Sequence, residues 1–70
     1  MVELGIYKHY KGGLYKVIAN GLIESTQHPA VIYEAMYDNP KSKIWIREEA
    51  DFLATVEVDG QRVARFTKQD

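Results

Sequence analysis

The sequence predicts an all-β fold, and three observations support this. Two turn dipeptides, Gly12-Gly13 and Asp59-Gly60, each lie between runs of alternating apolar and polar residues, as in β-hairpins. The run 30–37 is rich in β-branched residues and tyrosine, which favour strands. The chain has 70 residues, which is the size of one domain, and we expect its ordered core over about residues 4–66. Because closure would leave few exposed edges, we expect a small SH3-like barrel that is mainly β, with one short helical turn.

The first expected hairpin covers residues 5–19. If Gly12-Gly13 is a two-residue loop, Tyr10 pairs with Tyr15 and His9 pairs with Lys16. Side chains alternate across a strand, so each strand presents two faces. The expected core face carries Ile6, Lys8, Tyr10, Tyr15, Val17 and Ala19. The expected outward face carries Tyr7, His9, Lys11, Leu14, Lys16 and Ile18.

The middle of the chain is expected to hold a second strand. Asn20-Gly21 is a further turn signal, and the polar run 24–29 indicates an exposed loop that ends in proline. Residues 30–37 then alternate, and one face carries Val31, Tyr33, Ala35 and Tyr37. A helix is the alternative for this run, because Glu, Ala and Met are good helix formers.

The second half of the chain supplies the remaining elements. Residues 42–47 are expected to form a strand with Trp45 and Arg47 on one face. One helical turn follows over residues 48–53, and we expect its Phe52 and Leu53 to close one end of the core. Residues 55–63 form the second hairpin, in which Asp59-Gly60 pairs Val58 with Gln61, Glu57 with Arg62 and Val56 with Val63. Residues 67–70 are expected to fray.

Composition sets limits on the class of protein. The formal net charge is −1 and the chain has no cysteine. A strong overall field for nucleic acid or an anionic membrane is therefore not expected, and neither is a thiolate metal site. We find no signal-peptide pattern and no apolar run long enough to span a bilayer. The expectation is a cytoplasmic protein without membrane contact.

A set of motifs spread along the chain resembles a small bacterial family catalogued as domain of unknown function 1653. These are Gly5-x-Tyr7-x-His9-Tyr10-Lys11-Gly12-x-x-Tyr15-x-Val17, Glu24-Ser25-Thr26, Val31-x-Tyr33-x-Ala35-x-Tyr37, Trp45-x-Arg47, Phe52, Val56-x-Val58-Asp59-Gly60 and Arg65-Phe66. The family tends to have proline after the arginine of Trp-x-Arg, where this chain has Glu48. The resemblance implies a small, mostly β, single-domain protein. It implies no activity.

Motifs for catalysis and cofactor binding are weak in this sequence. Neither serine lies in a nucleophile-elbow pattern, and Ser25 or Thr26 with His28 would lie in a polar loop. The two histidines, His9 and His28, lack the short spacing of a metal site. Lys11-Gly12-Gly13 lacks the spacing of a phosphate-binding loop. We therefore expect no catalytic residues, no metal and no cofactor.

Aromatic and basic residues are the most informative group for function. Trp45 and Arg47 share a strand face, and such a pair either packs within the wall of the fold or binds a ligand. The candidate ligand-binding residues are Tyr7, His9, Lys11, Lys16, Trp45, Arg47 and Arg65. The leading hypothesis is a non-enzymatic binding module for a peptide, protein or RNA partner. The alternative is a structural protein that self-associates as a homodimer, and an enzyme is the least favoured class.

Overall fold

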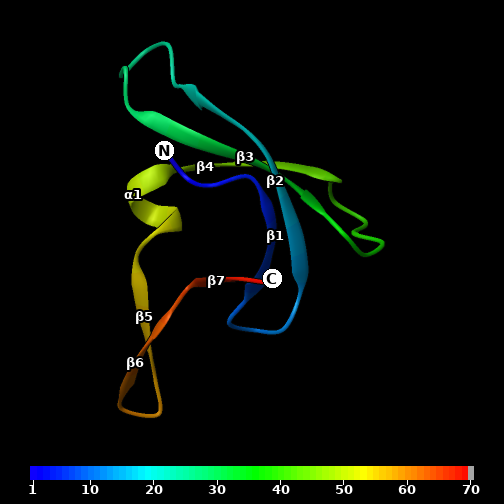
Figure 1. The fold of residues 1–70 in the computed structure, drawn as a ribbon, viewed down its shortest axis with the longest axis vertical. Helices are drawn as coiled ribbons and strands as arrows, with labels where there is room; N and C mark the ends of the chain where they lie inside the picture. The colour runs from blue at the N-terminus through cyan, green and yellow to red at the C-terminus, as the bar shows by residue number, and fades with distance from the viewer. Residues whose placement is uncertain (70) are drawn as a thin grey trace.

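The computed structural model describes residues 1–69, which form antiparallel sheets and one short helix (Figure 1). The elements in chain order are β1 (Gly5–His9), β2 (Leu14–Leu22), β3 (Pro29–Ala35), β4 (Ile44–Glu48), α1 (Glu49–Phe52), β5 (Thr55–Val58), β6 (Gln61–Ala64) and β7 (Phe66–Lys68). A five-stranded sheet has the order β4-β3-β2-β1-β7, and β5 pairs only with β6. Figure 1 shows this second hairpin extending away from the sheet.

The prediction of a mainly β fold with one short helical turn is confirmed, but the prediction of a barrel is wrong. The sheet ends at β4 on one side and at β7 on the other, and these strands do not pair within the described residues. The reason is that α1 follows β4 immediately and packs against β3 and β4. The chain then enters the separate β5–β6 hairpin instead of continuing the sheet.

The first hairpin has a longer loop than predicted, so its register is also different. Tyr7 pairs with Tyr15, and Lys8 pairs with Leu14. The His9 N–H donates to the Gly13 carbonyl at 2.8 Å, and the Gly12 N–H donates to the His9 carbonyl at 2.8 Å. Gly12 has a φ of 111°. This is the three-residue loop in which a β-turn is followed by a positive-φ residue, and it turns Tyr7 and His9 toward the core side.

Strand β2 continues through Asn20-Gly21, so the turn predicted there is wrong. A bulge at Ile18 shifts the register, because Val17 pairs with Tyr33 while Ala19 pairs with Ile32. After the bulge, the next side chain to face inward after Val17 is that of Asn20. The prediction that Ala19 lies on the core face is therefore wrong. The Asn20 amide accepts from the Val2 N–H at 3.0 Å and donates to the Val2 carbonyl at 2.9 Å. This pair of bonds holds Val2 in the core.

Strand β3 is the centre of the core, and the helix alternative for this run is wrong. Val31 is completely buried, and Tyr33 and Ala35 are also buried. On the adjacent strand β4, Trp45 lies opposite Tyr33 and Arg47 lies opposite Val31. Trp45 and Arg47 therefore share the inner face of the sheet, which is the face that carries the buried residues.

Helix α1 contributes one residue to the core. Phe52 is 1% exposed, and its ring stacks on Phe66 with a centroid distance of 4.1 Å and an interplanar angle of 6°. Leu53 is 62% exposed, so the prediction that it also closes the core is wrong. The helix ends at Phe52, and the next residue points to solvent. The core cluster consists of Val2, Tyr7, Val17, Val31, Tyr33, Phe52 and Phe66.

The hairpin at Asp59-Gly60 has the predicted turn and the predicted register. Both residues have positive φ, 50° and 79°, as a type I′ turn requires. Val58 pairs with Gln61, and Glu57 pairs with Arg62. The predicted fraying is wrong for the residues of β7, which pair with β1; Asp70 lies outside the described residues.

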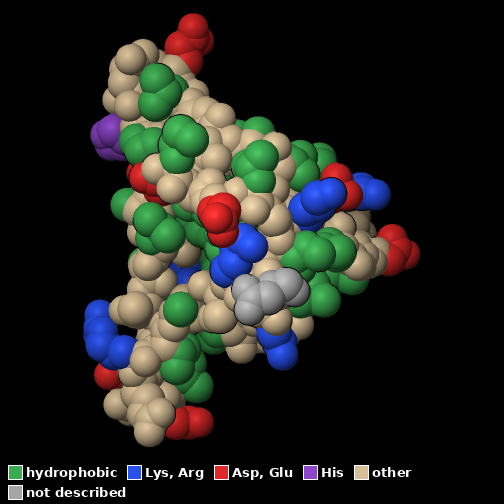
Figure 2. Space-filling model, viewed as in Figure 1, with side chains coloured by type: hydrophobic (Ala, Val, Ile, Leu, Met, Phe, Trp, Pro, Cys, Tyr) green, Lys and Arg blue, Asp and Glu red, His purple; other side chains and the backbone are tan. Residues whose placement is uncertain are grey.

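Charged groups are mixed over the molecule. Figure 2 shows basic and acidic side chains interspersed on the face in view, with hydrophobic side chains between them. This agrees with the net charge of −1 and leaves local clusters as the places where charge can select a ligand.

Candidate functional site

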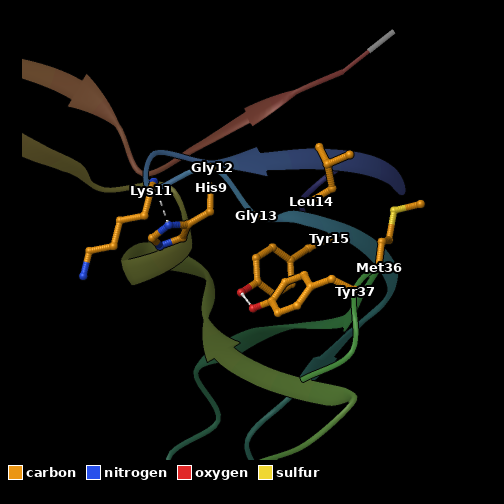
Figure 3. Close-up of a pocket in the computed structure, with 8 residues that line it drawn as sticks. All are labelled: His9, Lys11, Gly12, Gly13, Leu14, Tyr15, Met36 and Tyr37. Carbon is orange, nitrogen blue, oxygen red and sulfur yellow. Dashed lines mark hydrogen bonds between the residues drawn. The ribbon is translucent and has the colours of Figure 1, made fainter. Parts of the chain in front are cut away.

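Two adjoining grooves meet at His9 and Tyr15 on the inner side of the sheet. The larger has a volume of about 690 Å³ and lies along the β1–β2 loop (Figure 3). The smaller has a volume of about 390 Å³ and extends toward β4. The first is lined by His9, Lys11, Gly12, Gly13, Leu14, Tyr15, Met36 and Tyr37. The second is lined by His9, Tyr15, Tyr33, Asn39, Pro40, Lys41, Trp45, Arg47 and Phe66.

His9 takes its position from the loop that follows β1. Its Nδ1 accepts a hydrogen bond from the Lys11 N–H at 3.1 Å, so the neutral ring carries its proton on Nε2. The ring packs edge-on against Phe66 at 5.0 Å and against Tyr15 at 6.3 Å. Burial lowers the pKa of His9, and the cations Arg47, Arg65 and Lys11 lower it further. His9 is therefore a neutral hydrogen-bond donor at neutral pH.

Two tyrosines form the wall opposite His9. Figure 3 shows the hydroxyl groups of Tyr15 and Tyr37 pointing toward each other, and they form a hydrogen bond. Burial raises the pKa of Tyr15 to about 12, and the bond to Tyr37 adds to this effect. The Tyr15 hydroxyl thus stays protonated and is not a base at physiological pH.

Gly13 allows this close packing. A Cβ at this position would lie 3.1 Å from a ring carbon of Tyr37 and 3.3 Å from one of Tyr15. A side chain here would push the two rings out of place. Gly13 therefore leaves room for the Tyr15 and Tyr37 rings because it has no side chain, whereas Gly12 supplies the positive φ that the turn requires.

Arg47 is fixed by neighbours on two sides. Its Nε donates to the Tyr33 hydroxyl at 3.3 Å, and one terminal nitrogen lies 2.9 Å from Asp51 Oδ2. Its guanidinium carbon lies 5.9 Å from the centre of the Phe66 ring. Burial lowers the pKa of Arg47, but Tyr33 and the Asp51 carboxylate more than offset this, so the group stays charged. The result is a rigid cation over an aromatic floor.

Arg65 lies beside the same carboxylate. One terminal nitrogen is 3.8 Å from Asp51 Oδ1, and its buried Nε has no hydrogen-bond partner in the described part of the chain. Arg65 does not line either groove. Its influence there is electrostatic, because it is one of the cations that lower the pKa of His9.

The structure brings together four of the seven residues predicted to bind a ligand, namely His9, Lys11, Trp45 and Arg47. Tyr7 was predicted at the surface, but it is buried in the core. Its hydroxyl donates to the Glu3 carbonyl at 2.7 Å. Lys16 pairs with Ile6 on the outer face of the sheet, away from His9. Both errors follow from the register of the first hairpin, which reverses the faces of β1.

Several further groove or site residues were not predicted as such, and Tyr37, Asp51 and Lys41 illustrate why. Tyr37 was placed on the same face as Tyr33 by alternation, which was a usable signal for its position at the groove. Asp51 lies four positions after Arg47, but Arg47 belongs to β4 and Asp51 to α1, so no helical pattern in the sequence marked this ion pair. Lys41 lies in the turn between β3 and β4, and no local pattern marks it as a groove residue.

The site holds hydrogen-bond donors, cations and aromatic rings. Within residues 1–69, no three histidine or carboxylate side chains come together as a metal site.

The polar loop that holds Thr26 and His28 has its own contacts. The Thr26 hydroxyl accepts from the backbone N–H of His28, while the His28 ring lies 3.5 Å from Glu48. None of the helices described in the structure is long and apolar enough to cross a bilayer.

Comparison with known proteins identifies the family. A search of curated proteins found no significant match. A crystal structure of a DUF1653 protein from Bordetella bronchiseptica superposes with a TM-score of 0.90 at 24% sequence identity, over 97% of this chain and 87% of that one. This similarity shows a shared fold. The model of the family described as "Protein of unknown function (DUF1653)" matches residues 5–68. The chain therefore belongs to the DUF1653 family.

Proposed function

We propose that this protein is a non-enzymatic binding module that holds single-stranded RNA in the two grooves. One observation carries the proposal: the adjoining grooves combine aromatic rings with the cations Lys11, Lys41 and Arg47, and none of their lining residues is an acid. Proteins that bind single strands use this combination, because rings stack on bases while cations neutralise phosphates.

The geometry favours RNA over a peptide for two reasons. Tyr37 is 45% exposed beside the larger groove, so it offers a ring face to a base. The neutral His9 ring at the junction of the grooves donates from Nε2, which suits a phosphate oxygen or a base edge. A carboxylate side chain of a peptide would use the cations but leave the rings without a stacking partner.

The absence of a catalytic role is part of the proposal. The groove tyrosine with a strongly perturbed pKa, Tyr15, is held in its protonated form. His9 has a lowered pKa, and its Nδ1 is occupied by the hydrogen bond from the Lys11 N–H. Its Nε2 already carries the proton of the neutral ring, so it could accept a proton only after a change of tautomer. The groups are arranged to donate hydrogen bonds to a bound ligand.

The test is an NMR titration of the protein with a short single-stranded RNA at low salt. We expect amide shift changes at His9, Lys11, Gly13, Tyr37 and Lys41. Three groove cations predict that log K falls with log salt at a slope of about −2, since each neutralised phosphate of a single strand contributes about −0.7.

A matched pair of variants identifies the face that binds. Lys11→Glu/Lys41→Glu reverses two groove cations and should abolish binding. Lys8→Glu/Lys16→Glu makes the same change in net charge on two lysines outside both grooves, and it should bind within about twofold of wild type at matched salt. Equal losses in both variants, or no shift changes with excess RNA at low salt, would refute the RNA proposal. Shift changes at the grooves with a peptide library alone would instead assign a peptide or protein partner.

The alternative of a self-associating protein has separate support, which comes from the open edge of β4.

A further inference from the structure

Strand β4 has a free edge with a regular pattern of unpaired backbone groups. The Ala35 N–H donates to the Lys43 carbonyl at 2.8 Å, which makes this pair hydrogen-bonded. Because bonded and non-bonded pairs alternate in an antiparallel ladder, Trp45 and Arg47 bond to β3 as well. The N–H and C=O groups of Ile44, Ile46 and Glu48 therefore point away from β3.

Nothing in the described residues pairs with this edge as a strand. The Ser42 hydroxyl donates to the Ile44 carbonyl at 2.7 Å, and that oxygen has a second lone pair for another donor. Natural sheet edges are protected by lysine, proline, a bulge, short length or an inward-pointing charge, and β4 has the last two, since it has five residues and carries Arg47 on its inner face. Strand β4 contains no lysine or proline, and its register with β3 runs without a shift. Ile46 is 68% exposed on this strand.

We propose that two copies of this protein pair antiparallel through β4, with Ile46 opposite Ile46 of the second copy. In this register Ile44 lies opposite Glu48, so the outward N–H and C=O groups of both strands meet as hydrogen-bonded pairs. Trp45 then lies opposite Arg47 of the second copy on the inner face. A cation opposite an indole ring is an attractive pair, and it occurs twice by symmetry.

Neighbouring symmetric registers are disfavoured by charge. If Trp45 were central, Lys43 would lie opposite Arg47 of the second copy, and like charges opposite each other are destabilising. If Arg47 were central, the two arginines would face each other directly. The register centred on Ile46 avoids both.

The proposed dimer would join the two inner faces into one continuous sheet surface. Trp45 and Arg47 line the smaller groove, so Trp45 of the second copy would lie beside Arg47 of the first. Each copy thus contributes a ring to the other copy's groove. This inference does not depend on RNA as the ligand, because it rests on the backbone and charge pattern of β4.

The interface would be small. Strand β4 has five residues, and stable dimers usually bury about 1,200–2,000 Å² in total. We therefore expect a concentration-dependent dimer with a dissociation constant in the micromolar range or weaker. Sedimentation velocity from micromolar to millimolar concentrations measures this directly.

The first variant for this test is Ile46→Pro. The Ile46 N–H faces outward, so proline removes a hydrogen bond only to the second copy and is tolerated on an edge strand. We expect the dissociation constant to rise about tenfold or more. Far-UV circular dichroism and the melting temperature check that the variant folds.

A second pair of variants tests the register itself. Because Ile46 faces its own counterpart, Ile46→Asp and Ile46→Lys should each be monomeric, while an equimolar mixture should form a heterodimer. This mixture also controls for misfolding, since recovery of the dimer requires two folded partners. A wild-type protein that stays monomeric at millimolar concentration would overturn the proposal. A mixture that fails to associate would overturn the register centred on Ile46.

Discussion

Replacement of Phe52 by alanine should remove a large part of the stability of this protein. Phe52 is 1% exposed and stacks on Phe66 at 4.1 Å, with Tyr7 and Tyr33 against it edge-on at 5.4 and 5.6 Å. Burial of a phenylalanine contributes about 1.5–3 kcal/mol. The surrounding rings cannot easily collapse into the space left behind, and core Phe→Ala changes cost about 3–5 kcal/mol. We expect about 4 kcal/mol for Phe52→Ala.

This loss is a large part of the stability expected for the chain, and it equals the whole only at the lower end of the expected range. At about 0.05–0.15 kcal/mol per residue, a protein of 70 residues has a free energy of unfolding of about 4–10 kcal/mol. Since 1 kcal/mol shifts the melting temperature of so small a domain by about 4–8 °C, Phe52→Ala should melt about 16–32 °C below wild type.

Urea unfolding followed by circular dichroism is the assay, and the neighbouring residue provides the control. Leu53→Ala removes an apolar side chain that is 62% exposed, and it should change the free energy of unfolding by no more than about 0.5 kcal/mol. A cost below about 1 kcal/mol for Phe52→Ala, or equal costs for the two variants, would refute the assignment of Phe52 to the core.

Three further predictions concern the turn, the histidine and the ion pair. Gly60 has a φ of 79° and open space around a Cβ, so Gly60→Ala should cost about 1 kcal/mol through backbone strain alone, while Gly60→Asn should cost less in urea unfolding. The lowered pKa of His9 means that the unfolded chain takes up a proton near pH 6.5 and the folded chain only at lower pH. Stability should therefore be full above pH 6.5, fall as the pH decreases from 6.5 toward the folded pKa, and level off below it, and His9→Gln should flatten this fall in urea midpoints measured across the range. A ring titration midpoint of His9 at or above 6.5 by NMR would contradict this. Asp51→Asn removes the carboxylate between Arg47 and Arg65, so RNA affinity at low salt should rise severalfold with a steeper salt dependence; an unchanged affinity would mean that these arginines do not act on the ligand.

Local signals in the sequence predicted those parts of the fold whose pairing is itself local. Asp59-Gly60 determines its own hairpin, because both residues adopt positive φ and the strands join directly at the turn. The alternation in β3 correctly grouped Val31 with Tyr33 on one face, but both faces are largely apolar, so it did not decide which face is buried. In contrast, Gly12-Gly13 is compatible with two loop lengths. The longer loop places Tyr7 in the core against Phe52, and that contact joins distant parts of the chain, so no local pattern favours it.

The same distinction applies to the candidate site. Trp45 and Arg47 were predicted together because one strand positions both. Lys16 was predicted on the outward face and lies there, but His9 and Tyr7 were predicted to share that face and lie on the inner side, because the loop of the first hairpin is longer than predicted. Lys41 reaches the smaller groove only because β3 and β4 bring their connecting turn beside His9. The prediction of a closed barrel was wrong for a related reason. No local pattern in the sequence shows that α1 directs the chain away from the sheet.

The bulge at Ile18 has a consequence for the shape of the molecule. If Ile18 were deleted, Val17 would still face Tyr33 and Ala19 would still face Ile32, so the ladder would become regular without any change of partner. Bulges bend and twist the strand that carries them, so the shortened strand would be straighter. One extra residue therefore sets curvature independently of pairing. A lineage of this protein could change the bend of β2 by a single-codon deletion or insertion while the residues on either side keep their partners on β3.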